Sequence, residues 1–295
     1  MQQAELEHPA TLTIRPSGAA LCADVEGVDI NQPLSPAQVA TIQDAWARHC
    51  VLRFRGQQAL TLENLAKFSR NFGPLDMRPK ASMAMSKEHD ELPPEITVIS
   101  NVKVGGKPLG ALGDGEAVWH TDMTYNEIPP KGACLYAVEV PPSGGNTHFA
   151  NMYVAYDTLP QALKDRIQGL RCVHDASRNS AGELRIGYED VTDPRKTRGA
   201  IQPLVSTHAV SGRSCLLLGR RRNAYIVGLE MEESERLLDA LWAHATRPEL
   251  TWTQVWRVGD VMMWDNTCTM HKRDAFDPEC RRLMYRTQIA GTVAL

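Results

Sequence analysis

The sequence predicts a mainly β fold, a sandwich or barrel with helices on its outside. Three observations lead to this prediction. Short runs rich in β-branched and aromatic residues recur along the whole chain. Segments with helical spacing are few. The two kinds of segment do not alternate regularly, which argues against a doubly wound parallel sheet.

The predicted strands are short and are bounded by turn-forming residues. Each run has the length of one strand, and several are apolar at nearly every position. The runs cover residues 11–16, 50–56, 96–102, 133–140, 214–219, 251–257, 260–266 and 281–291.

Four segments predict helices. In residues 35–49, Ser35 is the expected N-cap, Pro36 takes the first helical position and Gln38 completes a capping box. A second helix is expected between Thr61 and Gly73, where a Gly-Pro pair ends it. The remaining two segments are 158–170 and 230–245.

The chain organisation predicts one domain over residues 1–295. There are no repeats, low-complexity tracts or Ser/Gly-rich linkers. Two irregular stretches, about 76–94 and 103–116, precede His120. Loops next to a candidate site often act as lids or substrate loops, although composition alone is equally typical of excursions without a role.

Bulk composition excludes several classes of protein. A formal net charge of -3 gives no electrostatic case for nucleic acid. No apolar run approaches the roughly 18 residues that a membrane span needs, and the N-terminus lacks the pattern of a signal peptide. Seven scattered cysteines without a C-x-x-C motif predict reduced thiols and a cytoplasmic location.

The stretch "AVWHTDMTY" places His120 and Asp122 two positions apart. If residues 118–122 are extended, both side chains face the same side. His271 follows a very apolar run and offers a third ligand. Two histidines and one carboxylate form the ligand set of non-haem Fe(II) oxygenases, whereas zinc more often takes histidine and cysteine. A chance H-x-D pair remains the alternative for the tripeptide alone.

Two arginines follow His271 on one face of the last predicted strand. Alternation places Arg282 and Arg286 on the same side of "RRLMYRTQIAG". If that side is interior, the guanidinium groups need anionic partners, and their planar fork suits carboxylates. Thr147, after a Gly-Gly turn, could donate to such a carboxylate. The alternative is a strand that faces water and a threonine that only follows a turn.

Several motifs resemble one known family. "WHTDMTY", "VPPSGGNTHFANMYVAYDTLP", "MMWDNTCTMH" and "RRLMYRTQIAG" are similar to the signatures of the taurine/2,4-dichlorophenoxyacetate dioxygenases, which depend on Fe(II) and 2-oxoglutarate. The similarity extends to "GVDINQPLS", "VLRFRGQQALT", "FSRNFGPLD" and "ISNV", and so covers nearly the whole chain in the family's order.

The resemblance implies a double-stranded β-helix (jelly roll, cupin-like) with flanking helices. It implies iron bound by His120, Asp122 and His271. It assigns Arg282 and Thr147 to the distal carboxylate of 2-oxoglutarate, and the position of Arg286 to an anionic group of the substrate. The implied reaction uses O2, converts 2-oxoglutarate to succinate and CO2, and hydroxylates an sp3 carbon of a small anionic molecule such as an aryloxyalkanoate.

Departures from the family pattern bear on the substrate. Taurine-using members carry asparagine four residues before the first iron histidine, where this chain has Glu116. If Glu116 lines the substrate pocket, it would repel a sulfonate. A taurine, alkyl-sulfonate or alkyl-sulfate enzyme is therefore the alternative within the family. The alternative of another class is a non-catalytic jelly-roll protein that binds a ligand. Zinc hydrolysis is disfavoured because no helical motif supplies a glutamate base.

Three adjacent arginines, Arg220, Arg221 and Arg222, have no assigned role. We expect a solvated cluster. The alternative is that one of them binds a larger anionic substrate. The number of subunits is left open, with a homo-oligomer among the options.

Overall fold

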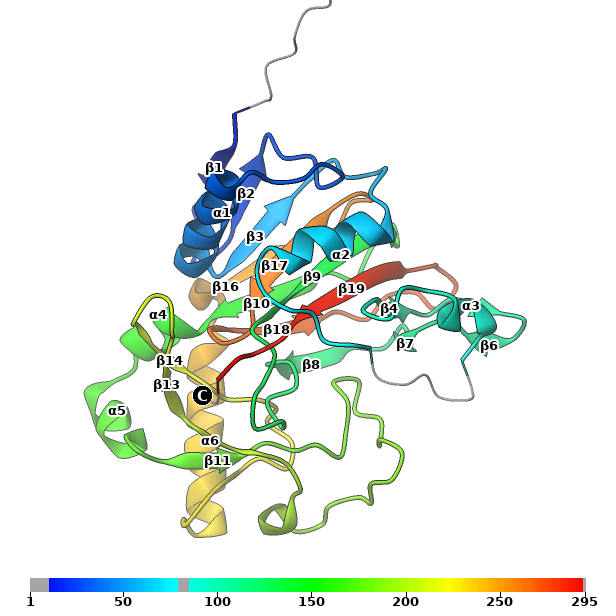
Figure 1. The fold of residues 1–295 in the computed structure, drawn as a ribbon. Coiled ribbons are helices and arrows are strands. Elements are labelled where there is room, and N and C mark those ends of the chain that lie inside the picture. Colours follow the sequence, from blue (N-terminus) through cyan, green and yellow to red (C-terminus); the bar gives the residue numbers. More distant parts are fainter. Residues whose placement is uncertain (1–10, 79–84, 294–295) are drawn as a thin grey trace, which may run out of the picture.

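The computed structural model describes residues 11–78 and 85–293, and in these ranges it is mainly β with helices outside the sheets (Figure 1). The larger sheet has eight strands, and most of its neighbouring pairs are antiparallel. In spatial order they are β1 (Thr13–Pro16), β2 (Ala23–Glu26), β3 (Val51–Phe54), β17 (Val261–Asp265), β9 (Gly132–Glu139), β19 (Leu283–Ile289), β4 (Thr97–Ser100) and β7 (Ala111–Leu112).

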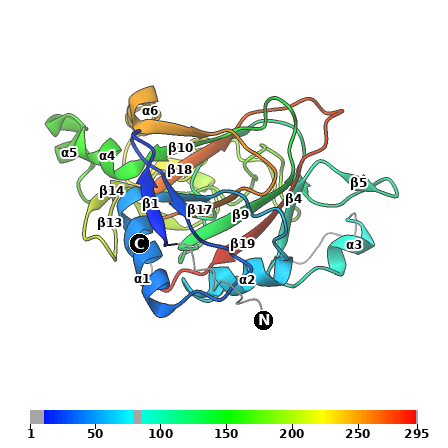
Figure 2. The ribbon, with the colours of Figure 1, turned by 90° about the horizontal axis from the view of Figure 1, so that it is seen from above.

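A smaller antiparallel sheet of four strands faces the larger one. Its order is β16 (Thr251–Gln254), β10 (Thr147–Asn151), β18 (Thr269–Arg273) and β8 (Ala117–His120). Seen from above, α1 (Pro36–His49) and α2 (Leu62–Arg70) lie on the opposite side of the larger sheet from β10 and β18 (Figure 2). The larger sheet is therefore covered on both faces.

Strand β17 shows how the sequence specifies these layers. Met262 and Trp264 point into the core between the sheets, while Val261 and Met263 pack with residues of α1 and α2. All five residues of β17 are buried. A strand covered on both faces needs apolar side chains at successive positions, which explains the continuous "VMMW" run.

Helix α1 begins as the sequence predicts. The Oγ of Ser35 accepts from the main-chain N–H of Gln38 at 3.3 Å, and the Oε1 of Gln38 accepts from the N–H of Ser35 at 2.8 Å. The predicted capping box is confirmed. At the other end, Trp46 packs so closely on Gly132 of β9 that an added Cβ there would lie 2.4 Å from the indole.

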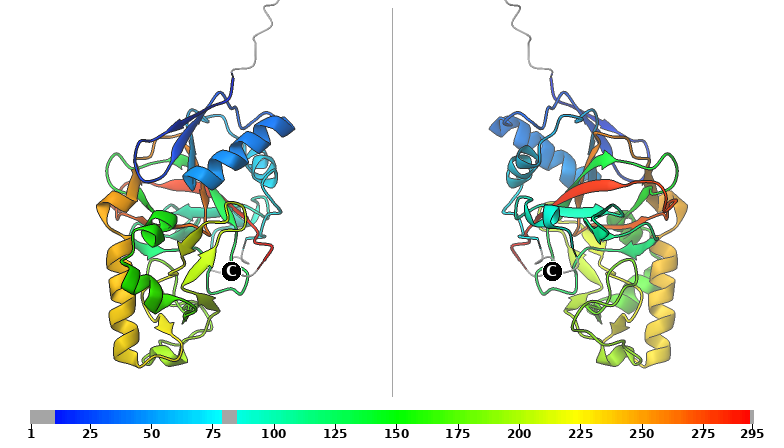
Figure 3. Two further views of the ribbon diagram at one scale, coloured as in Figure 1. Left: turned by 90° about the vertical axis from the view of Figure 1, so that its left-hand side faces the viewer. Right: turned by 90° about the vertical axis from the view of Figure 1, so that its right-hand side faces the viewer.

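The remaining elements lie outside the two main sheets, and most of residues 152–250 form the lower part of the molecule in Figure 1. Figure 3 shows α6 (Met231–Ala245), in yellow and orange, as a long helix along one side of this part, and it packs against α4 (Met152–Asp157). The other elements are α3 (Lys87–Asp90), α5 (Gln161–Ile167), the 3₁₀ turns Pro194–Lys196 and Pro248–Leu250, and the strands β5 (Lys103–Val104), β6 (Lys107–Pro108), β11 (Arg171–Val173), β12 (Ile201–Pro203), β13 (Val205–Thr207), β14 (Ser214–Leu216) and β15 (Tyr225–Ile226).

Each of the eight predicted strand runs contains a strand, and each of the four helical segments contains a helix. The stretch 103–116 was expected to be irregular, but it contains three short strands. Gly105 and Gly106 adopt positive φ in the turn that joins β5 to β6, and β7 pairs with β4 in the larger sheet. The stretch 76–94 contains α3, and its residues 79–84 lie outside the described ranges, as does the N-terminal segment 1–10. Among the described residues, no helix has the length and apolar character to cross a membrane.

The capping box of α1 gives a stability prediction. Ser35→Ala removes the acceptor for the Gln38 N–H and should lower the free energy of unfolding by about 1 kcal/mol, measured by urea titration. Ser35→Thr keeps a hydroxyl acceptor and should lose much less. Equal stability of Ser35→Ala and the unchanged chain would show that the cap does not contribute.

Candidate active site

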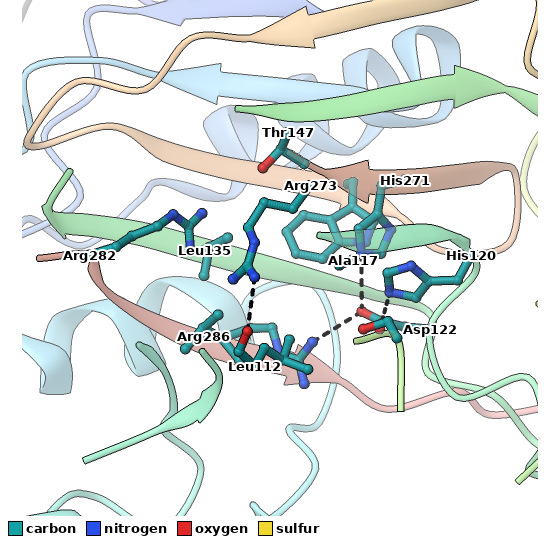
Figure 4. A pocket seen from close by; sticks show the side chains of 13 residues that line it. Leu112, Ala117, His120, Asp122, Leu135, Thr147, His271, Arg273, Arg282 and Arg286 are labelled. Atoms are coloured by element: carbon teal, nitrogen blue, oxygen red, sulfur yellow. Dashed lines mark hydrogen bonds and ion pairs between the residues drawn. The ribbon is translucent and has the colours of Figure 1, made fainter. Parts of the chain in front are cut away.

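The candidate site is a cavity of about 50 Å³ between the two sheets (Figure 4). Both sheets and their connecting turns supply its walls. The lining residues are Ile99, Leu112, Ala117, His120, Asp122, Leu135, Thr147, Ser180, Trp264, His271, Arg273, Arg282 and Arg286.

The two histidines meet because β8 and β18 are neighbouring strands. His120 pairs directly with His271 across the antiparallel ladder, and Phe149 of β10 pairs with His271 on its other side. Directly paired residues present their side chains on the same face. The imidazole centroids lie 4.2 Å apart. His271 therefore follows the apolar strand β17, as the sequence suggested, and lies within the next strand, β18.

Asp122 reaches the histidines in a different way from the one predicted. Strand β8 ends at His120, and Asp122 belongs to the following turn, so strand alternation does not place it. Instead, the side chain of Asn266 holds the main chain of Asp122. The Asp122 N–H donates to Oδ1 of Asn266 at 2.8 Å, and Nδ2 of Asn266 donates to the Asp122 carbonyl oxygen at 2.8 Å. The carboxylate then lies 3.5 Å from Nε2 of His120 and 3.9 Å from Nε2 of His271.

The protonation states of these three side chains suit a divalent metal ion. Nδ1 of His120 lies 2.7 Å from the carbonyl oxygen of Val118, which can only accept, so Nδ1 donates to it and Nε2 is the nitrogen directed at Asp122. Burial, with His120 as the next cause, lowers the pKa of His271 to about 3. Against the effect of burial, Arg286 and the two histidines hold the pKa of Asp122 well below its usual value. The ligand atoms all lie within 4.8 Å of one another.

Arg282 and Thr147 line the part of the cavity beyond His271 (Figure 4). Arg282 is 1% exposed, and its Nε and Nη1 have no partner among the described residues. Burial, followed by the proximity of Arg273, lowers its pKa to about 9. The hydroxyl of Thr147 accepts from Trp256 Nε1 at 3.0 Å, which leaves its own hydrogen available to a further acceptor. Together they offer donors to a carboxylate.

Arg286 also points into the cavity, as strand alternation predicts. Its Nη1 lies 3.2 Å from Oδ2 of Asp122. This face of the last strand is thus interior and not in water, and Arg286 contacts a candidate metal ligand.

Glu116 does not join the cavity. Its side chain is exposed and precedes β8, and it is not among the lining residues. The described arrangement therefore gives no support to its predicted contact with substrate.

The structure corrects the expected solvated cluster at residues 220–222. Arg220 is 8% exposed, because its main chain pairs with His120 at the edge of the smaller sheet. Arg221 binds Glu235 and Asp239 on the surface, and Arg222 is exposed.

Two polar lining residues were missed by the sequence analysis. Arg273 lies two positions after His271 in β18, and its Nη2 donates to the carbonyl oxygens of Leu112 and Gly115. The same alternation that paired Arg282 with Arg286 would have placed it beside His271. Ser180 comes from the irregular stretch after β11, and no sequence signal marks it.

A second cluster of possible ligands, His208, Asp265 and Cys268, is a closed hydrogen-bond network. Both imidazole nitrogens of His208 are used, by Ser211 and Asp265. The other carboxylate oxygen of Asp265 accepts from the main chain and hydroxyl of Thr267. This network orders the turn between β17 and β18 that carries Asn266.

The two hydrogen bonds between Asn266 and the main chain of Asp122 give a prediction about metal affinity. Replacing Asn266 by Ala removes both contacts to the Asp122 main chain and should weaken Mn(II) binding about 10- to 100-fold, measured by calorimetry. His271→Ala should weaken Mn(II) binding more than Asn266→Ala does. The matched control is Asn71→Ala, because the Asn71 amide also donates to main-chain carbonyls, but at the end of α2. Equal affinity in Asn266→Ala and Asn71→Ala would contradict the positioning role.

Comparison with known proteins agrees with this geometry. The sequence matches the family described as taurine catabolism dioxygenase TauD, TfdA family, over residues 13–288. It is 34% identical to an alpha-ketoglutarate-dependent 2,4-dichlorophenoxyacetate dioxygenase of Cupriavidus pinatubonensis, over 94% of this chain and 96% of that protein. An alpha-ketoglutarate-dependent sulfate ester dioxygenase of Pseudomonas putida is 31% identical over 97% and 92%.

A solved structure is also similar to this chain over nearly its whole length. The crystal structure of AAD-2 in complex with Mn(II) and N-oxalylglycine superposes with a TM-score of 0.77 at 32% identity, covering 96% of this chain and 99% of that one. The chain therefore belongs to the TauD/TfdA family and is an Fe(II)- and 2-oxoglutarate-dependent dioxygenase.

Proposed function

We propose that this enzyme hydroxylates an sp3 carbon of a small anionic substrate of the aryloxyalkanoate type, with conversion of 2-oxoglutarate to succinate and CO2. One observation carries the proposal: a single cavity holds the candidate metal ligands, one buried arginine suited to the cosubstrate and another, Arg286, suited to an anionic substrate. The guanidinium of a buried arginine is costly without an anion beside it.

His120, Asp122 and His271 would hold Fe(II), which they fit because two imidazole nitrogens and an ionised carboxylate converge. Bound there, iron supplies the oxygen activation and C–H oxidation that no side chain can perform. Two histidines and one carboxylate leave further coordination positions for other ligands.

Arg282 and Thr147 would bind the distal carboxylate of 2-oxoglutarate. The support is a guanidinium with unpartnered N–H groups and a hydroxyl whose hydrogen is available, both on the cavity wall. Arg273 adds a third donor group beside Arg282.

Arg286 would bind the acidic group of the substrate. Its guanidinium lies next to Asp122, so a substrate held by it would have its carbon skeleton close to the metal ligands. The relative from Cupriavidus pinatubonensis is named for an aryloxyalkanoate, 2,4-dichlorophenoxyacetate. A sulfate ester or sulfonate is the second candidate, because guanidinium binds such groups as well and the relative from Pseudomonas putida is named for a sulfate ester.

We also infer a single jelly-roll domain in which the two facing sheets form a double-stranded β-helix. Its support is the antiparallel pairing of β17, β9, β19 and β4 on one side and of β16, β10, β18 and β8 on the other. Seven cysteines without a disulfide bond support the proposed cytoplasmic location.

The role of Arg282 predicts a specific loss of cosubstrate binding. Removing one partner of a desolvated charge pair costs on the order of 3–5 kcal/mol. Arg282→Ala should therefore raise the concentration of 2-oxoglutarate needed for half-maximal turnover at least about 100-fold, while Mn(II) affinity measured by calorimetry stays the same. An unchanged 2-oxoglutarate requirement would show that this guanidinium has another partner.

The role of Arg286 predicts a loss of substrate binding. Arg286→Gln should weaken binding of the acid substrate strongly, while 2-oxoglutarate decarboxylation without substrate continues. The measurement is succinate formed with and without a panel of aryloxyalkanoates, sulfonates and sulfate esters. Arg281→Gln is the matched control, because Arg281 forms a surface ion pair with Glu139. If neutral esters were oxidised as well as the free acids by the unchanged enzyme, the substrate would not need its charge.

A further inference from the structure

Arg220 lies at the edge of the smaller sheet, next to the candidate metal ligands. Its main chain forms an antiparallel bridge with His120, and the N–H of Thr121 donates to the carbonyl oxygen of Gly219 at 3.0 Å. Because paired residues present their side chains on the same face, Arg220 is on the face that carries His120 and His271.

The guanidinium of Arg220 has no anionic partner among the described residues. Arg220 is 8% exposed. Its guanidinium forms no hydrogen bond with the described residues, and its buried Nε has no partner among them. Asp122 and Asp175 are the carboxylates whose charge raises its pKa, and neither has an oxygen within 4.0 Å of its nitrogens. Asp122 contacts Arg286, and the oxygens of Asp175 already accept from Ser177 and Asn223.

The other groups around Arg220 do not compensate its charge. Arg185 lies over the ring of Tyr125 at 4.2 Å from the centroid, and Arg220 lies 5.7 Å from the same centroid. His174 is 1% exposed and neither of its ring nitrogens has a partner among the described residues. The surroundings thus add a second cation, Arg185, and an unpartnered histidine whose pKa is lowered to about 3 by burial and by Arg220.

A buried cation without a partner destabilises a fold, so a purely structural role is a poor explanation for Arg220. The face of the ring of Tyr125 attracts it only weakly. The side chain is instead available to a ligand that brings negative charge into the space beside the metal ligands.

We propose that Arg220 binds a second acidic group of the substrate, so that the substrate class is a dianion with two carboxylate or sulfonate groups. The proposal rests on the proposed function, in which Arg286 binds the first acidic group. Arg286 belongs to the larger sheet and Arg220 to the edge of the smaller one. A substrate held by both would therefore extend past the metal ligands, with a carbon between its acidic groups exposed to oxidation.

The test compares acids that differ only in their number of charges. The protein is loaded with Mn(II) and saturating N-oxalylglycine, and binding of linear α,ω-diacids and of monoacids of matched chain length is measured by calorimetry. We expect a diacid to bind at least about tenfold tighter than its matched monoacid, since a second charge-assisted contact is added. Arg220→Gln should abolish this difference and leave monoacid affinity unchanged. Arg222→Gln, which alters an exposed arginine two positions away, should preserve it.

The outcomes separate the two proposals. Failure of every acid to bind the unchanged protein would refute the anionic substrate itself. Equal affinity for matched monoacids and diacids, or a difference that survives in Arg220→Gln, would overturn only the role of Arg220. A loss of N-oxalylglycine affinity in Arg220→Gln would also overturn it, because the arginine would then serve the cosubstrate.

A stability measurement tests the structural explanation directly. In the ligand-free protein, Arg220→Met removes an unpaired buried charge and should leave the thermal midpoint unchanged or raise it. Arg221→Met is the comparison, because it breaks the ion pairs with Glu235 and Asp239. A fall of the midpoint in Arg220→Met as large as in Arg221→Met would mean that Arg220 holds the fold together and would overturn the proposal.

Discussion

The pairing of β8 with β18 is the constraint on which the site depends. Two histidines that are about 150 positions apart in sequence become direct neighbours only because His120 and His271 are partners in one antiparallel ladder. A shift of this register by one residue would turn one imidazole to the other face of the sheet. The register is held on both sides, by β10 next to β18 and by the hydroxyl of Thr121, which donates to the carbonyl oxygen of Thr269. The network around Asp265 then places Asn266, and Asn266 places Asp122.

The charge of the cavity is as important as its metal ligands. Among the described residues, Arg273, Arg282 and Arg286 line it and Arg220 lies beside it, while Asp122 is the one carboxylate in its wall. Burial is the largest cause of the lowered pKa of Arg220, Arg273 and Arg282, which expresses the cost of keeping cations there. Such a surplus of positive charge destabilises the ligand-free protein and favours anionic ligands. An enzyme whose cosubstrate is a dicarboxylate and whose proposed substrate is an acid has a use for it.

Local patterns in the sequence predicted the parts of the fold that obey local rules. The capping box at Ser35 and the alternation that directs Arg282 and Arg286 inward both depend on residues a few positions apart, and both are confirmed. Asp122 was expected in the site for the wrong reason, because its position depends on a contact with Asn266, 144 positions away. The burial of Arg220 was missed for the same kind of reason: a bridge to His120 cannot be seen in "GRRRN". The exposure of Glu116 likewise follows from where β8 begins and not from its spacing to His120.

The site is divided between the sheets in a way that separates its tasks. The smaller sheet and the turn after β8 supply the candidate metal ligands, while β19 of the larger sheet supplies Arg286, and Arg282 immediately precedes that strand. The two candidate imidazole ligands are thereby held by one ladder, and the two arginines proposed for cosubstrate and substrate lie in or directly before a strand of another. Arg282 lies one position before β19 and Arg286 is the fourth residue of that strand, so a short extended segment sets the distance between the two positions. With the roles proposed for the two arginines, this separation gives the cosubstrate and the substrate different places in one cavity.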